Sequence, residues 1–253
     1  ALVLSQLGRY EAAAEMTKRM QEVAQMKTDF VSVVSHELRT PLTSIIGSLD
    51  TVIRPELSQE ASLDLIDSAR RQAGRLQRLI EDLLMVSRID RQSVPVAPEQ
   101  IKLLPYLHDV TGAVKVEGLT ISVEPSDLVI SADPDHLGRV FINLVENARK
   151  YAPDSPIEIV ARAVRSRVDI DVVDHGEGIS LDQQARIFDR FTQVERSDTR
   201  TRGGTGLGLS IVKGLVEAMG GQVSVGDTPG GGATFTVSLP PATVDEEFSP
   251  RSF

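Results

Sequence analysis

Apolar side chains recur over the first ninety residues at alternating steps of three and four positions. The first stripe runs through Met16, Met20, Val23, Lys27, Phe30, Val34, Leu38, Leu42, Ile45, Leu49 and Val52. Beyond a break at residues 54–58, a second runs through Leu65, Ala69, Gln72, Leu76, Leu79, Leu83 and Val86. This average spacing is typical of a coiled-coil seam. It predicts an all-α helical hairpin, which we expect to dimerise into a four-helix bundle.

The pattern changes after Ser93–Pro98, a proline-punctuated segment that predicts a linker between domains. Beyond it we expect helices near 104–115, 133–151 and 206–219. Short apolar runs predict strands near 119–123, 128–130, 157–164, 167–174, 222–225 and 233–239. Helices and antiparallel-type strands in this mixture indicate an α+β sandwich, with helices on one face of a sheet.

Composition narrows the function classes. The formal net charge of -9 argues against nucleic acid as a partner. The chain has no cysteine, which excludes disulfides, thiolate nucleophiles and cysteine metal sites. No window approaches the roughly 18 consecutive apolar residues of a membrane span. Because Ala1 already stands inside the predicted helix, we expect a fragment of a longer protein, whose upstream part would hold any membrane anchor or sensor.

The first chemical candidate lies on the first long helix, in the stretch Ser35-His36-Glu37-Leu38-Arg39-Thr40-Pro41. Helical geometry turns His36 away from the apolar seam, and Thr40, one turn later, shares its face. A neutral imidazole is a competent nucleophile, and a neighbouring carboxylate can accept its other proton. For the His-Glu pair alone, the alternative is an ordinary surface histidine in a helix that Pro41 kinks.

A second candidate is the stretch from Asn143 to Tyr151. Asn143 and Asn147 stand one helical turn apart, Lys150 and Tyr151 continue their face, and the opposite face is apolar. Amide oxygens suit a hard cation such as Mg²⁺, and a lysine suits the phosphates that it carries. The alternative is an exposed polar face with nothing bound.

A third candidate is Asp174-His175-Gly176-Glu177-Gly178-Ile179. Asp174 falls in the inward phase of the preceding predicted strand, where a carboxylate is costly unless a donor meets it. The exocyclic amino group of adenine would be such a donor, and the glycines would let a ring approach the backbone. A plain turn that ends a strand would explain the glycines but not the phase of Asp174.

Two glycine-rich stretches complete the set. Gly203-Gly204-Thr205-Gly206-Leu207-Gly208 opens a predicted helix, whose N-terminal amides favour an anion. Ile211 stands where the dinucleotide-binding fingerprint needs its last glycine, so that fingerprint does not fit. No Gly-Lys-Ser/Thr follows, so the stretch is not a Walker loop either. The stretch from Gly230 to Phe235 is typical of a hairpin turn.

Together and in this order, these stretches resemble the sensor histidine kinase family over roughly residues 16–240. His36 stands in an H box, Asn143–Tyr151 in an N box, Asp174–Ile179 in a G1 box, Ile187–Phe191 in an F box and Gly204–Leu209 in a G2 box. The resemblance implies a dimerisation and histidine-phosphotransfer hairpin, followed by a Bergerat-type ATP-binding domain.

The resemblance also implies roles for single residues. His36 would be the phosphoacceptor, Glu37 its general base, and Thr40 a participant in dephosphorylating the regulator. Asn147 would hold Mg²⁺ with help from Asn143. The nucleotide would be bound by Asn143, Asn147, Lys150, Tyr151, Asp174, Gly176, Gly178, Ile179, Arg200, Gly204, Thr205, Gly206, Leu207, Gly208 and Thr234. Thr192-Gln193 departs from the Tyr-Arg of many members, so we expect the phosphate-facing arginine at Arg200, in a lid over residues 192–203.

The expected protein is thus the cytoplasmic catalytic core of a homodimeric sensor histidine kinase. It would pass the γ-phosphoryl group of Mg-ATP to His36 and then to an aspartate of a response regulator. We expect a signal-transmitting helix over 1–26, a phosphotransfer domain over 27–93, an ATP-binding domain over 99–240 and a flexible tail over 241–253. Neither nucleic acid nor contact of this fragment with a membrane is expected.

Two alternatives belong to other classes. A topoisomerase- or chaperone-type ATPase of the same fold would need a carboxylate base where Asn143 stands, and it would lack the histidine hairpin. A degenerate dimeric scaffold would bind a receiver domain without phosphorylating it, although every expected catalytic position is filled. Labelling with ATP separates the scaffold from the kinase.

Overall fold

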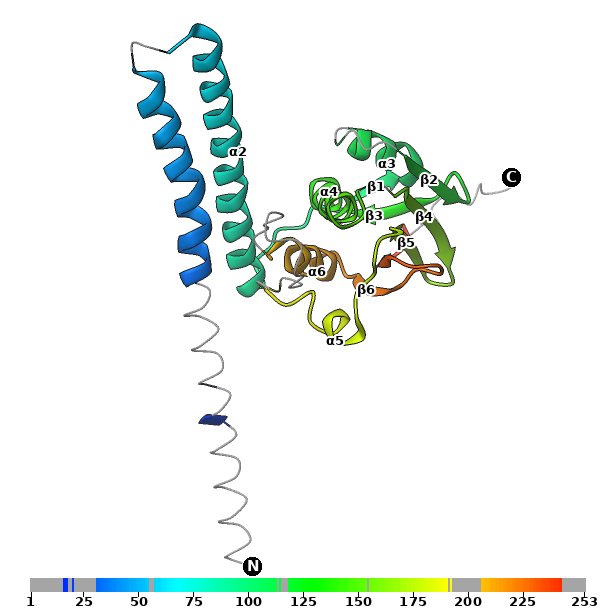
Figure 1. Ribbon diagram of the computed structural model, residues 1–253. Coiled ribbons are helices and arrows are strands. Elements are labelled where there is room, and N and C mark those ends of the chain that lie inside the picture. Colours follow the sequence, from blue (N-terminus) through cyan, green and yellow to red (C-terminus); the bar gives the residue numbers. More distant parts are fainter. Residues whose placement is uncertain are drawn as a thin grey trace, which may run out of the picture. The chain divides into compact units, whose positions relative to one another are not determined.

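The computed structural model describes residues 16–17, 20, 31–54, 57–112, 114, 118–153, 155–190, 192 and 206–242 (Figure 1). The chain forms two compact units, residues 1–81 and 82–253, and each is described by itself. Apart from residues 16, 17, 20, 241 and 242, the predicted N-terminal helix (1–26) and tail (241–253) lie outside the described residues. In the part that is described, no helix combines the length and the apolar character needed to cross a bilayer.

The first unit contains the predicted helical hairpin except for the last turns of its second helix, residues 82–90, which belong to the second unit. Its first helix covers residues 31–52, and α2 (Gln59–Asp90) follows after a short connection. The predicted stripe of α2 lies on its less accessible side, where Ala69 and Leu79 are buried. The helical hairpin is therefore confirmed.

The first helix carries a second apolar stripe, which the sequence pattern did not separate from the first. Leu42, Ile46, Leu49 and Ile53 follow one another at helical spacing and are 48%, 50%, 50% and 78% exposed. Pro41 and Ser48 are buried on another side of the same helix. The predicted single seam therefore mixed apolar positions from two sides of this helix.

The second unit is built on a five-stranded sheet in the order β2-β4-β5-β7-β6. The pair β2–β4 is parallel, and the other three pairs are antiparallel. The strands of this sheet are β2 (Leu119–Glu124), β4 (Ile157–Val164), β5 (Arg167–Val173), β6 (Gln222–Asp227) and β7 (Ala233–Leu239). A separate antiparallel pair joins β1 (Glu99–Lys102) to β3 (Val129–Ala132).

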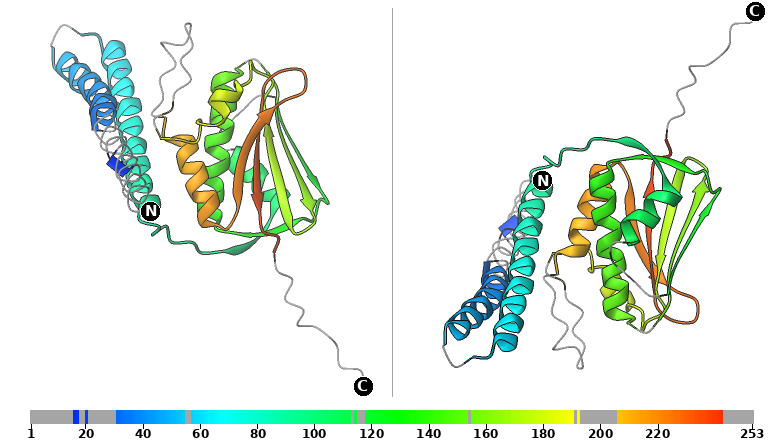
Figure 2. Two further views of the ribbon diagram at one scale, coloured as in Figure 1. Left: turned by 90° about the horizontal axis from the view of Figure 1, so that it is seen from below. Right: turned by 90° about the horizontal axis from the view of Figure 1, so that it is seen from above.

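Helices cover one face of the sheet, as the α+β prediction requires (Figure 2). The helices of this unit are α3 (Leu103–Gly112), α4 (Pro134–Tyr151), the short α5 (Leu181–Gln184) and α6 (Gly208–Ala218). On the covered face Val168, Ile170 and Val172 of β5 are fully or almost fully buried. This alternation along β5 is the one that placed Asp174 in the inward phase.

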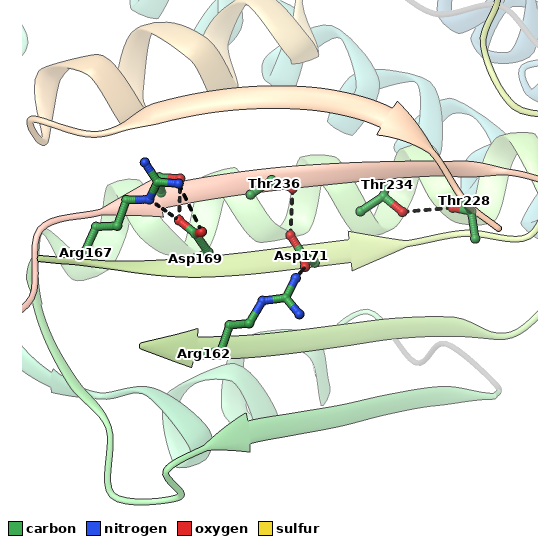
Figure 3. A network of polar contacts seen from close by, with 8 residues as sticks. Arg162, Arg167, Asp169, Asp171, Thr228, Thr234 and Thr236 are labelled. Carbon is green, nitrogen blue, oxygen red and sulfur yellow. Dashed lines mark hydrogen bonds and ion pairs between the residues drawn. The ribbon is translucent and has the colours of Figure 1, made fainter. Parts of the chain in front are cut away.

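The open face of the sheet carries a ladder of polar contacts (Figure 3). Asp171 on β5 accepts a hydrogen bond from Thr236 of 2.6 Å and pairs with Arg162. Asp169 accepts a bond of 2.6 Å from Ser238 and pairs with Arg167. Both carboxylates are largely buried, and these partners compensate for the water that they lose.

Asp133 caps the start of α4 and also holds the linker. Asp133 accepts a hydrogen bond from the backbone N–H of His136 (3.0 Å) and another from that of Ala97 (2.8 Å). Burial alone would raise the pKa of the Asp133 carboxyl, but these N–H donors outweigh burial and keep the pKa below its ordinary value. A further bond of 2.8 Å joins the His136 ring to the carbonyl of Pro95. The irregular segment Ser93–Pro98 is thereby tied to the helix that carries the predicted N box.

Candidate active site

Helix α4 forms one wall of the predicted nucleotide site. Asn143, Asn147 and Lys150 are half-buried on one side, whereas the side that contains Phe141 and Leu144 is completely buried. The predicted division of this helix into a polar and an apolar face is confirmed. Lys150 Nζ donates to the hydroxyl of Tyr151 (3.2 Å) and lies 4.8 Å from the centre of its ring. A hollow of about 440 Å³ beside this end of α4 is lined by Glu146, Arg149, Lys150 and Pro153.

Asp174 lies at the end of β5 with 6% of its surface exposed. One carboxylate oxygen, Oδ1, accepts the backbone N–H groups of Gly176 (3.0 Å) and Ala233 (3.1 Å). These bonds compensate for the burial that the sequence predicted. Both bonds end on Oδ1, and among the described residues no hydrogen bond to the other oxygen, Oδ2, is seen, so Oδ2 can accept one from a ligand.

The turn after Asp174 depends on close backbone contacts. A Cβ at Gly176 would lie 3.0 Å from the Cβ of Ala152 and 3.1 Å from the carbonyl oxygen of Tyr151, at the end of α4. Gly178 has φ +76°, and a Cβ there would lie 2.9 Å from the carbonyl oxygen of Gly232. The two glycines thus seat the turn between α4 and the β6–β7 connection.

The β6–β7 connection supports the site more than a plain hairpin turn would. Gly232 has φ +110°, and a Cβ there would overlap the carbonyl oxygen of Asp174. Its neighbour Ala233 donates to Asp174, as described above. Neither residue was predicted to belong to the site; the signal in the sequence was the run of three glycines, Gly230–Gly232.

These contacts predict a large loss of stability for Gly232→Ala. The new methyl group would overlap Asp174, and alanine disfavours this φ, so we expect unfolding to become easier by about 3 kcal/mol or more. Gly230→Ala is the matched control: it has φ +91° but open space around it, so its expected cost is about 1 kcal/mol. Urea denaturation measures both. Equal losses for the two variants would contradict the packing role of Gly232.

The start of α6 meets α4 at Asn143. A Cβ at Gly208 would lie 3.0 Å from Asn143 Oδ1, and Asn143 Nδ2 donates to the carbonyl of Arg139 (2.9 Å). Gly206 has φ +67°, and Leu207 is completely buried. The structure therefore brings the predicted N-box helix and the start of the predicted G2 helix into contact.

Other predicted residues are placed as follows. The backbone carbonyl of Ile179 accepts a hydrogen bond of 2.8 Å from Gln184, which also bonds to Asp227 and was not predicted from the sequence. The hydroxyl of Thr234 bonds to Thr228 in the open-face ladder (2.9 Å), so the structure does not bring it to Asp174. Arg200, Gly204 and Thr205 lie outside the described residues.

The predicted F box contributes an apolar anchor. Ile187 is 4% exposed. Phe188 packs edge-to-face against Phe235 of β7, with ring centres 6.4 Å apart. This contact attaches the segment before the predicted lid to the sheet. Phe191 and residues 193–203 lie outside the description.

The predicted acceptor lies on the first helix. The side chain of His36 is 78% exposed, and its Nδ1 lies 3.9 Å from Glu37 Oε1. The hydroxyl of Thr40 donates to the backbone carbonyl of His36 (3.1 Å). The predicted solvent exposure of His36 is confirmed, and the bond of Thr40 is the one that a threonine inside a helix commonly makes to the carbonyl four residues earlier.

The donor set fits a magnesium ion that is shared with phosphates. Among the described residues, no group of three or more histidine, cysteine, aspartate or glutamate side chains could hold a metal by itself. Mg²⁺ commonly takes only one or two protein ligands and completes its shell with water and phosphate oxygens. The amides of Asn147 and Asn143 could supply such ligands from the polar face of α4.

Two family models match separate parts of the chain. The His Kinase A (phospho-acceptor) domain matches residues 26–92, and the family described as histidine kinase-, DNA gyrase B- and HSP90-like ATPase matches residues 132–243. The first match contains His36, Glu37 and Thr40. The second contains α4, Asp174 and the start of α6.

Individual curated proteins are similar to this chain across both matched regions. Sensor protein DivL of Caulobacter vibrioides is 37% identical over 90% of this chain, and sensor histidine kinase RcsC of Escherichia coli is 34% identical over 94%. The matched parts are 30% and 26% of these relatives' own lengths. Among solved structures, full-length ShkA in complex with AMPPNP aligns with a TM-score of 0.63 at 27% identity, over 85% of this chain and 46% of that one. The chain belongs to the sensor histidine kinase family.

Proposed function

We propose that this chain is the catalytic core of a sensor histidine kinase, which phosphorylates His36 from Mg-ATP and passes the phosphoryl group to an aspartate of a response regulator. The observation that carries the proposal is the exposed imidazole of His36 with a carboxylate 3.9 Å from its Nδ1, in the part of the chain that matches the phosphoacceptor model.

The proposed transfer needs one proton acceptor. Nε2 of His36 forms a bond to the γ-phosphorus, the bond between that phosphorus and the bridging oxygen of ADP breaks, and ADP leaves. Nδ1 then has a proton to release, and Glu37 is placed to take it. Because little covalent chemistry is left to the protein, the rate rests on positioning and on neutralising charge.

The ATP-binding unit supplies the positioning. Asp174 Oδ2 would accept a hydrogen bond from the exocyclic amine of adenine, and Gly176 and Gly178 hold the adjoining turn against α4 and the β6–β7 connection. Asn143 and Asn147 would hold Mg²⁺, which when bound neutralises charge on the phosphates. Lys150 stands on the same face of α4, and the N-terminal amides of α6 favour an anion. The structure of ShkA with AMPPNP supports a nucleotide as the ligand of this fold.

The proposed partners follow from the hairpin. The stripe formed by Leu42, Ile46, Leu49 and Ile53 exposes apolar surface along the first helix. A second copy of the hairpin would cover it in a four-helix bundle. We therefore include homodimerisation in the proposal, with a receiver domain as the acceptor of the phosphoryl group.

Labelling tests the proposal directly. The protein is incubated with γ-³²P-ATP and Mg²⁺, and the labelled product is exposed to acid and to alkali. A label that acid removes and alkali leaves is expected for phosphohistidine. Undetectable labelling of a folded protein that binds nucleotide would favour the dimeric scaffold instead.

A finer part of the proposal is dephosphorylation of the regulator through Thr40. Its hydroxyl hydrogen is engaged with the His36 carbonyl, but the oxygen can still accept from a water. A receiver docked at His36 would present its phospho-aspartate beside that oxygen, one helical turn away, and the water could be held in line with the phosphorus.

Thr40→Ala should leave labelling of His36 within a few-fold of wild type but slow the loss of phosphate from the regulator by ~10-fold or more. The measurement is decay of purified phospho-regulator with excess kinase and ADP. Thr51→Ala is the control, because it removes the same kind of hydroxyl-to-carbonyl bond, to Gly47, from the same helix. If Thr40→Ala and wild type give equal decay above the regulator's own rate, Thr40 has no such role.

A further inference from the structure

We propose that Arg75 is a positioning residue for phosphorylation of His36, acting through Glu37. The inference rests on the proposed function, since it assumes that His36 is the nucleophile. Nothing in the sequence pattern linked Arg75 to this site: it lies on α2, and Glu37 lies on the first helix, 38 positions earlier.

The carboxylate of Glu37 lies between an imidazole and a guanidinium, and each partner faces a different oxygen. Oε1 is 3.9 Å from Nδ1 of His36, and Oε2 accepts a hydrogen bond of 3.4 Å from Nη2 of Arg75. The side chain of Glu37 is only 21% exposed, against 78% for His36 and 48% for Arg75. The three groups thus form a row that crosses the hairpin.

The neighbouring basic residues of α2 are engaged elsewhere. Arg70 donates to Asp67 (2.8 Å), and Arg71 also pairs with Asp67, within the same helix. Of these three arginines, Arg75 is the one that reaches the first helix in the described structure.

An exposed ion pair of this kind adds little to stability. We expect it to act on orientation. A glutamate side chain has several rotatable bonds, and a hydrogen bond to its carboxylate restricts rotation about them. A planar guanidinium also restricts the direction from which the carboxylate can be approached. With Oε2 held by Arg75, Oε1 stays on the side of His36.

This orientation selects one form of the histidine ring. A carboxylate oxygen beside Nδ1 favours the neutral tautomer with the hydrogen on Nδ1, which leaves the lone pair on Nε2 for attack on phosphorus.

The kinetic test compares substitutions on one helix. Arg75→Gln should lower the rate of His36 labelling at saturating ATP by about 10-fold and leave the KM for ATP within about 2-fold, because nucleotide binding is not involved. Arg75→Lys keeps the charge and should recover most of the rate. Arg78→Gln, an exposed arginine three positions further along α2, is the matched control and should label like wild type.

Two further measurements show whether Arg75 acts through Glu37. In a Glu37→Gln background, adding Arg75→Gln should lower the rate of His36 labelling little further, because the carboxylate that Arg75 orients is already gone. The ¹⁵N resonances of His36, recorded at about pH 8 where an ordinary imidazole is neutral, should show mainly the Nδ1–H tautomer in wild type and more Nε2–H tautomer in Arg75→Gln.

The inference is overturned if Arg75→Gln labels as fast as Arg78→Gln, or if it slows labelling equally with and without Glu37. An unchanged tautomer ratio in Arg75→Gln also overturns it. A wild-type protein that takes no label would instead contradict the proposed function. The tautomer measurement needs no ATP, so it still decides the role of Arg75 in that case.

Discussion

Replacing His36 with glutamine should abolish labelling from γ-³²P-ATP, by at least ~1000-fold, while nucleotide affinity stays at the wild-type value. A glutamine amide has a similar reach but no nucleophilic lone pair on nitrogen, so the bond to phosphorus cannot form. His36 lies in the first compact unit and the predicted nucleotide residues in the second, so binding is not expected to change. Labelling measures the first effect, and calorimetry with an ATP analogue measures the second.

His108→Gln is the matched control for this experiment. His108 is an exposed histidine on α3, so its replacement changes the same chemical group on a surface without a proposed role. It should label at the wild-type rate. Label that persists in His36→Gln would move the phosphoacceptor to another residue and refute the assignment of His36.

Asp174→Asn should weaken ATP binding by about 30-fold without unfolding the protein. The amide oxygen of asparagine can still accept the N–H groups of Gly176 and Ala233, as Oδ1 does now. The amide NH₂ group then replaces Oδ2, and a donor faces the donor on adenine. A lost charge-assisted hydrogen bond is worth about 2 kcal/mol, which corresponds to this change in affinity.

Asp171→Asn provides the matched control. Asp171 is also 6% exposed and stands three residues earlier, but it belongs to the ladder on the open face of the sheet. Calorimetry should give wild-type affinity for this variant, while thermal unfolding shows both proteins folded. Wild-type affinity in Asp174→Asn would mean that adenine is bound elsewhere.

The features that were predicted from the sequence are those that depend on periodicity. The alternation along β5 is strict, so it placed Asp174 in the inward phase without knowledge of its partners. The helical period of α4 likewise separated Asn143 and Asn147 from Phe141 and Leu144. Such predictions need only the geometry of one element, because a strand repeats every two residues and a helix every 3.6.

The features that were missed depend on contacts between elements. β1 contains a single buried residue, Ile101, so its four-residue pattern gave no strand signal, and it exists by pairing with β3. The role of Gly232 follows from the proximity of Asp174, 58 positions earlier. The pairing of Glu37 with Arg75 requires the hairpin to bring the two helices together. A one-dimensional pattern contains none of these distances.

The two stripes of the first helix show a subtler limit. Leu42 and Leu49 continue the apolar spacing of Leu38 and Ile45, so a single seam described the sequence well. In the structure, Leu42 and Leu49 are about half exposed and follow Ile46 and Ile53 instead. An apolar period identifies a helix, but it does not assign each residue to one side when apolar residues stand on two sides of that helix.

The polar ladder on the open face of the sheet has a consequence for solution behaviour. A flat sheet face without a helical cover usually invites stacking against another sheet, and an apolar one would drive aggregation. Here a second molecule could stack only by stripping water from Arg162, Arg167 and the carboxylates that they neutralise, which costs more than the contact would return. The cost of removing this water therefore disfavours association through this side of the ATP-binding unit, even at the high local concentration that a dimer of hairpins would impose.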